Sequence, residues 1–381
     1  MKQRLFVTLS LAGLAMATFG ATKPKAAIKS LNKATVQQPT YTEWHDLQVN
    51  AINRFPLHTN FFTYPADDWV SEKDGKIVSK DILHMNKTES KYFLSLDGTW
   101  KFYWVANADQ RPTDFYKEDL DDSKWKTMNV PGNWEMNGFG DPEYVNVGFG
   151  WRGHFDQQPP AVPTKDNHVG SYRRIIDIPA NWDGKQVVAH FGSVTSNIYL
   201  YVNGKFAGYA EDSKVAAEFD ITPYLKKGKN LIAFQTFRWC DGSWDEDQDF
   251  WRLSGVARES YLFARDAKLH LEDIRVTPDL VNNYKDGVLN ISTKVKGNGK
   301  LVFTLFDKDG KQVATTTGVA KNGTANFSLQ VANPQKWSAE TPYLYTLQVS
   351  LIGTQKKDAM KAASMTPVKV GFRKVEIKNK Q

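Results

Sequence analysis

The sequence predicts an all-β protein with two consecutive β-sandwiches, a jelly roll followed by an immunoglobulin-like sandwich. Three observations favour this fold class. Short runs in which apolar and polar residues alternate recur along the chain, and turn residues separate them. Aromatic residues make up 13% of the 381 residues, and aromatic side chains favour pleated, half-buried surfaces. Strand-like and helix-like segments do not alternate, so a parallel α/β fold is not expected.

The N-terminus has the pattern of a secretory signal peptide, which we predict over residues 1–21. Lys2 and Arg4 precede an apolar run from Leu5 to Ala17, and small residues follow up to Ala21. The run is shorter than the roughly 20 apolar residues that a membrane span requires. We therefore expect an exported protein, periplasmic or secreted, and no membrane span.

Charge and cysteine content exclude some classes of protein. The net charge is +7, but basic and acidic residues are interleaved. Binding of nucleic acid would require basic residues gathered on one face, so it is not expected. The chain has one cysteine, Cys240, and therefore no internal disulfide. We expect Cys240 to be a small buried apolar residue rather than a nucleophile.

The first domain is predicted over residues 91–266, after a flexible or extended segment at residues 22–90. Its first strand, Thr99–Trp104, places alternate aromatic residues on one face. The pair Asn203-Gly204 between two apolar runs predicts a tight hairpin, since both residues tolerate positive φ. The other predicted strands of the jelly roll are Tyr172–Ile178, Val187–Phe191, Ile198–Val202, Lys205–Tyr209, Asn230–Phe237 and Ser260–Phe263.

The second domain is predicted over residues 267–381 as an immunoglobulin-like sandwich. Gly-containing turns separate its short strands, and the Cys–Trp–Cys pattern of antibody domains is absent. The predicted strands are Leu269–Val276, Gly287–Val295, Lys300–Phe306, Thr324–Val331, Tyr343–Leu351 and Thr366–Val375.

One segment, Arg238–Gly255, combines five acids with three tryptophans and two arginines. One interpretation is a sugar-binding edge, in which carboxylates accept hydrogen bonds from hydroxyls and rings stack on the sugar. A second is a calcium loop with Asp245, Asp247 and Asp249 as oxygen ligands, although the glycine and closing glutamate of an EF-hand are missing.

A third interpretation of this segment is structural. In that case Arg238 and Arg252 neutralise acidic neighbours, while Trp239 and Trp251 pack inward. This arrangement is compatible with either of the other two, because most residues of such a segment must support the local fold whatever it binds.

The segment, with motifs elsewhere, resembles β-galactosidases of glycoside hydrolase family 2. The resemblance extends over roughly residues 42–375, and the motifs occur in the family's order. They are Val130–Met136, Pro142–Val147, Pro159-Pro160 and Val162-Pro163 before Gly170–Arg174, Val202–Ser213, Glu218–Thr222 and Arg238–Gly255.

The resemblance implies substrate-binding roles for Asn146 and Asp249. In this family two loops of the first domain reach the galactose pocket, and the matching aspartate also binds a monovalent cation. The alternatives are a turn cap for Asn146 and an ion pair with an arginine for Asp249. The complete enzymes of the family use Mg and Na ions, whereas no cofactor is expected for this chain.

The resemblance also implies that the catalytic residues lie elsewhere. Family members hydrolyse glycosides with retention through two glutamates about 5 Å apart, and both are on strands of a (β/α)₈ barrel. Such a barrel takes about 250 residues, more than follow Ala267. Glu211 and Glu246 match no catalytic position, so no catalytic residue is assigned in this chain.

Three hypotheses follow for the function. The chain is an incomplete β-galactosidase, from a truncated gene or a partial record, that is inactive alone. Alternatively, it is one chain of a split enzyme whose separate barrel docks here, or a carbohydrate-binding module with millimolar affinity for β-galactosides. A surface that meets a missing or separate barrel should be apolar. The natural galactoside and the oligomeric state are left open.

Overall fold

The computed structural model describes residues 38–73, 76–79, 83, 85–153, 155–353 and 364–377. The predicted signal peptide lies outside these residues. In the described part, no helix has the length and hydropathy needed to cross a membrane.

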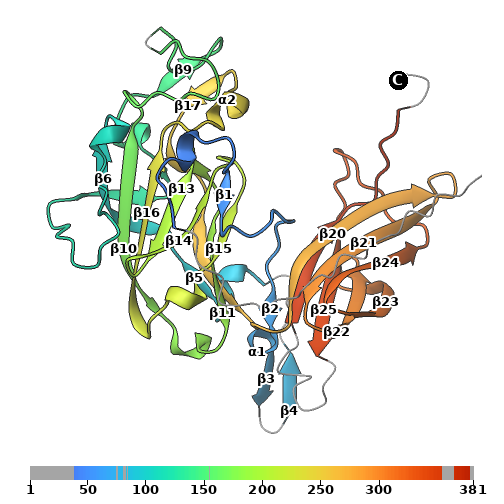
Figure 1. The fold of residues 1–381 in the computed structure, drawn as a ribbon. Coiled ribbons are helices and arrows are strands. Elements are labelled where there is room, and N and C mark those ends of the chain that lie inside the picture. The colour runs from blue at the N-terminus through green and yellow to red at the C-terminus, as the bar shows by residue number, and fades with distance from the viewer. Residues whose placement is uncertain are drawn as a thin grey trace, which may run out of the picture. The chain divides into compact units, whose positions relative to one another are not determined.

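The first sandwich contains a seven-stranded antiparallel sheet in the order β1-β14-β13-β16-β10-β6-β7 and a four-stranded sheet in the order β15-β11-β19-β5 (Figure 1). Every strand predicted for this domain is confirmed, with ends that shift by a few residues. The bounds are β1 Ala51–Ile52, β5 Phe93–Ser95, β6 Gly98–Val105, β7 Lys126–Val130, β10 Val169–Ile178, β11 Gln186–Phe191, β13 Ile198–Val202, β14 Lys205–Ala210, β15 Ala217–Asp220, β16 Gly228–Phe237 and β19 Ser260–Arg265.

Hydrophobic side chains cover both faces of the larger sheet. Trp100, Phe102 and Tyr172 lie in the core between the two sheets, as the alternation in β6 predicts. A second cluster, which includes Trp151 and Tyr199, packs on the opposite face. The aromatic content of the chain is therefore used mainly in cores, and only those rings that stay exposed are available for binding.

The hairpin between β13 and β14 is confirmed. Asn203 and Gly204 have φ values of 49° and 76°, and Val202 pairs with Lys205 on either side of them. Asparagine and glycine adopt this left-handed conformation at low cost, which explains the tight turn.

The stretch before β5 is extended, with short elements. Its strand β1 pairs with β14, and Trp44 and Ile52 are buried, so part of it packs as an integral piece of the first sandwich. The elements are η1 Glu43–His45, β2 Tyr64–Pro65, α1 Ala66–Trp69, β3 Val70–Lys73, β4 Lys76–Ser79 and η2 Lys87–Glu89.

The second sandwich has a five-stranded sheet in the order β2-β26-β25-β22-β23 and a three-stranded sheet in the order β20-β21-β24. Leu301, Phe303 and Leu347 are among the residues of its core. The bounds are β20 His270–Val281, β21 Asp286–Lys296, β22 Gly299–Phe306, β23 Gln312–Ala320, β24 Gly323–Val331, β25 Tyr345–Gly353 and β26 Ser364–Val370.

The second sandwich differs from the prediction in one added strand and in two strand ends, of which β20 ends at Val281 and not at Val276. Strand β23 was not predicted, because its threonines and small residues form a weak apolar pattern. The strand predicted to end at Val375 ends at Val370, since Val370 pairs with Tyr345, the first residue of β25. Phe372 then bridges to Lys336 instead.

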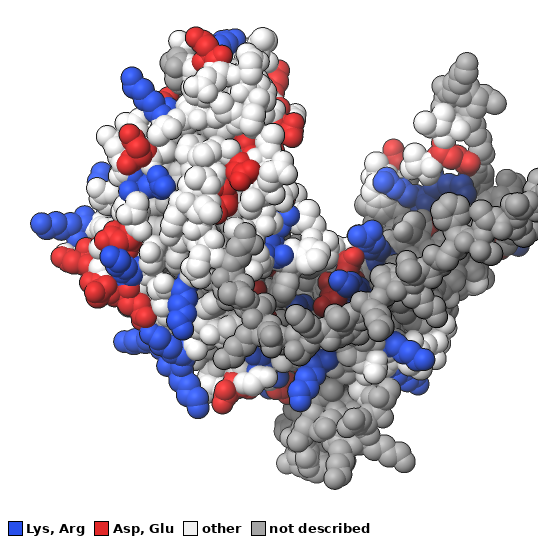
Figure 2. All heavy atoms as spheres, viewed as in Figure 1, with Lys and Arg blue, Asp and Glu red and all other residues white. Residues whose placement is uncertain are grey.

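The remaining elements connect or close the first sandwich. They are η3 Ala108–Gln110, β8 Gly132–Asn133, η4 Glu135–Asn137, β9 Glu143–Val145, η5 Ala180–Trp182, β12 Val194–Thr195, η6 Thr222–Tyr224, α2 Ser243–Glu246, β17 Phe250–Arg252 and β18 Gly255–Val256. On the face drawn in Figure 2, basic and acidic side chains are interspersed over the described surface.

Candidate functional site

The candidate site is built on a two-stranded ribbon, β9 and β17, at one end of the first sandwich (Figure 1). The strands are antiparallel, and the last pair on this side is Val145 with Phe250. Asn146 directly follows Val145, and Asp249 directly precedes Phe250, so both residues adjoin the last pair at one end of the ribbon. Both residues are exposed. The two residues to which the sequence assigned substrate binding thus lie at the same end of one ribbon, although they are about a hundred positions apart.

Aromatic residues flank this pair. The Tyr144 hydroxyl donates a hydrogen bond to Oδ1 of Asp249 at 2.5 Å, and this bond raises the pKa of Tyr144. The ring of Trp251 meets that of Tyr144 edge-on, with centroids 5.5 Å apart. Trp251 is 49% exposed, so the expectation that it packs inward is wrong: its position on a two-stranded ribbon leaves no second layer to cover it.

Arg252 fixes the backbone that carries Asp249. Its Nη1 donates to the carbonyl oxygens of Gln248 at 2.6 Å and Phe250 at 2.7 Å. Its Nη2 donates to the carbonyl of Val145 at 3.3 Å and forms an ion pair with Asp247. Arg252 is buried, so one guanidinium connects both strands of the ribbon to the preceding loop.

A second arginine supports the ribbon from inside. Arg238 is buried and its Nη2 lies 2.9 Å from Oε2 of Glu143, on β9. Trp239 is also buried, with the Arg238 guanidinium 4.8 Å from its ring centroid. The structural interpretation is therefore confirmed for both arginines and for Trp239. These residues support the fold whatever the ribbon binds.

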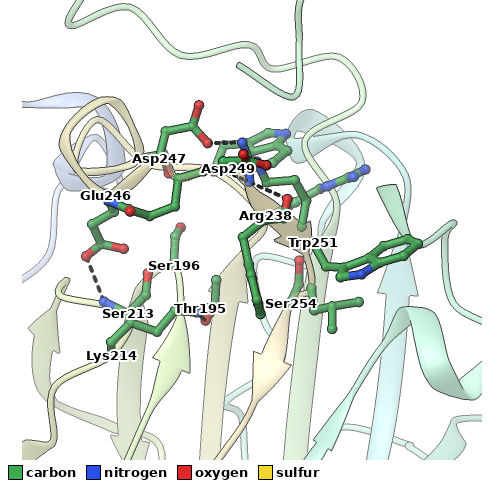
Figure 3. A pocket seen from close by; sticks show the side chains of 16 residues that line it. Thr195, Ser196, Ser213, Lys214, Arg238, Glu246, Asp247, Asp249, Trp251 and Ser254 are labelled. Atoms are coloured by element: carbon green, nitrogen blue, oxygen red, sulfur yellow. Dashed lines mark hydrogen bonds and ion pairs between the residues drawn. The ribbon is translucent and has the colours of Figure 1, made fainter. Parts of the chain in front are cut away.

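A cavity of about 310 Å³ lies beside Asp249 and Trp251. Hydroxyl and charged side chains line it, including Ser196, Lys214 and Glu246. Figure 3 shows the Glu246 carboxylate turned toward the backbone of Ser213, whose N–H donates to Oε1 at 2.8 Å. Burial lowers the pKa of Lys214. The cavity offers several hydrogen-bonding groups next to the exposed ring of Trp251.

The calcium interpretation finds no support in the described residues. Asp247 is engaged by Arg252 and Asp249 by Tyr144. Within the described part of the chain, Asp245, Asp247 and Asp249 do not gather as a group that could hold a metal ion. Asp247 and Asp249 are therefore bound by different side chains of this protein, an arginine and a tyrosine.

Sequence reasoning missed Tyr144 as a member of the site. A signal for it was present, because Tyr144 is only two positions before Asn146, and Trp251 is two positions after Asp249. The lining residues Ser196 and Lys214 come from distant segments and left no comparable signal.

Comparison with known families agrees with this architecture. Residues 93–266 match the sugar binding domain of the glycosyl hydrolases family 2. Residues 269–373 match a further domain model of glycosyl hydrolases family 2. The chain belongs to glycoside hydrolase family 2. The two matched domains correspond to the two sandwiches, so the candidate ribbon lies in the part of the family fold that is described as sugar binding.

Curated relatives of this family 2 chain are β-galactosidases. The chain is 36% identical to the β-galactosidase of Priestia megaterium over 352 residues, which cover 89% of this chain and 32% of that enzyme. It is 32% identical to the β-galactosidase large subunit of Leuconostoc lactis, covering 88% of this chain and 52% of that subunit. The chain thus spans about a third of the first of these relatives and about half of the second.

A solved structure agrees on the fold. The β-glucuronidase of Bifidobacterium dentium superposes with a TM-score of 0.59 at 18% identity, over 75% of this chain and 49% of that enzyme. At this identity the likeness concerns the fold alone.

Proposed function

We propose that this chain forms one wall of the galactose pocket of a family 2 β-galactosidase, whose catalytic barrel contacts the ribbon. The observation that supports the proposal is the pairing of Val145 with Phe250, next to which the exposed residues Asn146 and Asp249 lie at one end of the ribbon. The β-galactosidase names of the relatives support the substrate class. The reaction itself, hydrolysis of a terminal β-galactoside, requires two glutamates that we assign to the barrel.

The chemistry of the ribbon suits a sugar. The amide of Asn146 can both donate to and accept from hydroxyl groups. The bond from Tyr144 uses Oδ1 of Asp249 and leaves Oδ2 for a ligand. Trp251 offers an exposed ring beside it. A site of this kind discriminates against sugars that lack the hydroxyl it binds, because its own polar groups are then left unpaired.

Asp249 also fits the monovalent cation that the family resemblance implies. An exposed carboxylate can supply one oxygen ligand, and the remaining ligands would come from the barrel. We assign no residue of this chain to the Mg ions of complete family members.

The barrel is proposed to cover the apolar surface of the ribbon. Tyr144, Val147, Phe250 and Trp251 are all exposed and lie within or beside β9 and β17. Exposed apolar residues that cluster in this way mark interaction surfaces. A partner that covers them would bring its own sugar-binding groups next to Asn146 and Asp249.

A chimeric enzyme tests this proposal. Residues 38–377 would replace the matching third of the Priestia megaterium β-galactosidase, and hydrolysis of nitrophenyl β-galactoside would be measured. We expect an active chimera in which Asp249→Ala and Asn146→Ala each lower kcat/KM by 100-fold or more, corresponding to about 3 kcal/mol. The exposed substitution Val319→Ala is the control. A folded chimera without activity, or one unaffected by the two substitutions, would contradict the proposal.

A separate second chain is the alternative source of the barrel. The name of the Leuconostoc lactis relative identifies it as a large subunit, so at least one relative is divided between chains. If the barrel that completes this chain is a separate protein, it should bind this chain when produced on its own, and Phe250→Ser with Trp251→Ser should abolish the binding.

The exposed Tyr144–Trp251 pair favours a sugar-binding module as a second candidate. Half a pocket predicts dissociation constants on the order of millimolar. Calorimetric titration with methyl β-galactoside tests this expectation, since micromolar binding by this chain alone would contradict a half pocket and indicate a complete binding site.

Export is proposed from the sequence alone. Lys2, Arg4 and the apolar run from Leu5 to Ala17 form the pattern of a secretory signal. Fusion of residues 1–30 to a reporter enzyme that is active only outside the cytoplasm would test it. Deletion of Leu5 to Ala17 should then retain the reporter inside the cell.

A further inference from the structure

Beneath the loop that leads to Asp249, three buried side chains meet. Glu211 follows β14, and Cys240 and Asp241 follow β16. A carboxylate oxygen of each acid and the sulfur of Cys240 lie within 4.8 Å of one another. Glu211 is 7% exposed and Asp241 is 5% exposed. None of the three contributes to the proposed sugar site.

A carboxylate oxygen of Glu211 lies within 4.8 Å of one of Asp241, and both side chains are buried. Two ionised carboxylates this close in a buried site repel each other, so the arrangement favours a proton on one of them. The hydroxyl of Tyr209 donates to Oε1 of Glu211 at 2.6 Å. Burial is the main cause that raises the pKa of Glu211 to about 8, and the nearby charge of Asp241 adds to it. Burial likewise raises the pKa of Asp241. The proton is therefore present at neutral pH.

The charged and titratable neighbours do not replace this proton. The guanidinium of Arg54 donates to the backbone oxygen of Glu211 and forms its ion pair with Asp212. Asp46, from the N-terminal stretch, acts on Asp241 and raises its pKa. On the remaining sides are Tyr209, Tyr199, Glu246 and the thiol of Cys240, whose pKa is itself raised by burial.

The pair lies where the loop is attached to the sandwich. The backbone N–H of Asp241 donates to the carbonyl of Trp44 at 3.0 Å. Gly242 is so close that a Cβ there would lie 3.0 Å from Oε2 of Glu211. A few residues on, Glu246 receives the Ser213 N–H at 2.8 Å. The segment after β14 is thus joined to the loop at two points, and the carboxyl pair is the first of them.

We propose that the proton shared by Glu211 and Asp241 positions Asp249, by holding the base of the loop of residues 241–249 against the end of β14. Loss of the proton leaves two adjoining negative charges in a buried site, and the loop then opens. Glu211 and Asp241 are positioning residues in this arrangement. The consequence for sugar binding depends on the function proposed above, whereas the attachment of the loop does not.

Amide hydrogen exchange of the full chain tests the attachment. The variant Glu211→Gln keeps a neutral donor at every pH, and comparison at equal pH cancels the intrinsic exchange rate. At pH 6.5 the two proteins should exchange alike over residues 241–249. At pH 9 the wild-type chain should exchange at least ten-fold faster there than the variant. Glu118→Gln, at an exposed carboxylate, should match the wild type at both values.

Equal protection of wild type and Glu211→Gln at pH 9 would overturn the proposal. If Glu211→Gln fails to fold, Asp241→Asn takes its place, with the same expected protection at pH 9. The chimeric enzyme then separates attachment from function. A rise in KM above pH 8 that Glu211→Gln abolishes supports the positioning of Asp249. Faster exchange with no change in KM would support the proposed attachment of the loop but contradict the positioning of Asp249.

Discussion

The two sandwiches differ in the number of charged side chains that they bury. The buried acids and arginines of the described residues all precede residue 260. They are Glu43, Asp68, Glu135, Arg173, Glu211, Glu218, Arg238, Asp241 and Arg252. In the second sandwich the buried polar residues are His270, Thr293, Thr304, Thr346 and Thr366.

The buried charges of the first sandwich orient the loops of the candidate site, whereas the packing of apolar side chains stabilises the second sandwich. A buried charge is tolerated only where partners compensate its lost hydration. In the first sandwich those partners orient loops, as Arg252 does for β17. The second sandwich relies mainly on apolar contacts, so its stability should respond more to lost side-chain volume than to lost charge. Its buried His270, whose pKa burial lowers to about 4, is the exception.

The largest effect is expected in the second sandwich. Phe303 is fully buried and contacts Phe327 with ring centroids 4.7 Å apart. Phe303→Ala should lower the free energy of unfolding by about 4 kcal/mol, through lost burial and a cavity. Urea unfolding followed by circular dichroism measures it. Val319→Ala, at an exposed valine of the same sandwich, should cost less than about 0.5 kcal/mol.

A somewhat smaller loss is expected for Arg252→Met in the first sandwich. The variant leaves Asp247 without its ion pair and frees the carbonyl groups that Arg252 holds, at a cost of about 3 kcal/mol. Hydrogen exchange should show the loss of protection concentrated in residues 243–252. Arg275→Met, at an exposed arginine paired with Asp273, should have almost no effect. Equal losses of stability in Arg252→Met and Arg275→Met would contradict the expected difference between buried and exposed charges.

A pH effect should distinguish the sandwiches further. Oε2 of Glu218 is 2.9 Å from Nε2 of His58, and Oε1 is 2.8 Å from Nδ1 of His190. Burial alone would raise the pKa of Glu218, but the two histidines outweigh it and lower the pKa to about 2. The hydrogen bond with Glu218 raises the pKa of His58 above 6.5.

The stability from Glu218 is therefore present above pH 4.5 and lost as the pH falls toward 2. The stability from His58 is present below pH 6.5 and lost as the pH rises through its raised pKa. His58→Gln should remove about 1–2 kcal/mol near pH 5.5 and much less at pH 9. Calorimetric melting of both proteins at these pH values measures the difference. A loss that is independent of pH would contradict the charged hydrogen bond.

The smallest effect on stability is expected at the exposed ribbon. Tyr144→Phe removes one solvent-exposed hydrogen bond, so the free energy of unfolding should change by less than about 0.5 kcal/mol. In the chimeric enzyme the same substitution should still raise KM, because Asp249 loses the hydroxyl that fixes its Oδ1. Unchanged KM would assign Tyr144 to packing with Trp251 alone.

The parts of the fold that depend on local pattern could be predicted. The hairpin at Asn203-Gly204 follows from two residues that tolerate positive φ, and β6 follows from its alternating aromatic residues. Strand β23 could not be predicted, since its threonines become strand residues only through pairing with β22. The end of β26 likewise depends on where its partner β25 begins.

In the candidate site, too, some features could be predicted from the sequence and others could not. The sequence singled out Asn146 and Asp249 through resemblance to a family, but it contains no local information that the two residues lie at the same end of one ribbon. That arrangement comes from the register of β9 with β17, a long-range pairing. Burial also depends on what packs above a residue, which explains why Trp239 matched its predicted burial and Trp251 did not.

The buried position of Cys240 allows the opening of the surrounding structure to be measured by thiol labelling. Cys240 is 1% exposed, the pKa of its thiol is raised by burial, and it is the single cysteine in the sequence. A thiol reagent can therefore react with Cys240 only when the structure around this residue opens. The rate of labelling would record how often this part of the molecule opens, in the unmodified protein and without an added dye.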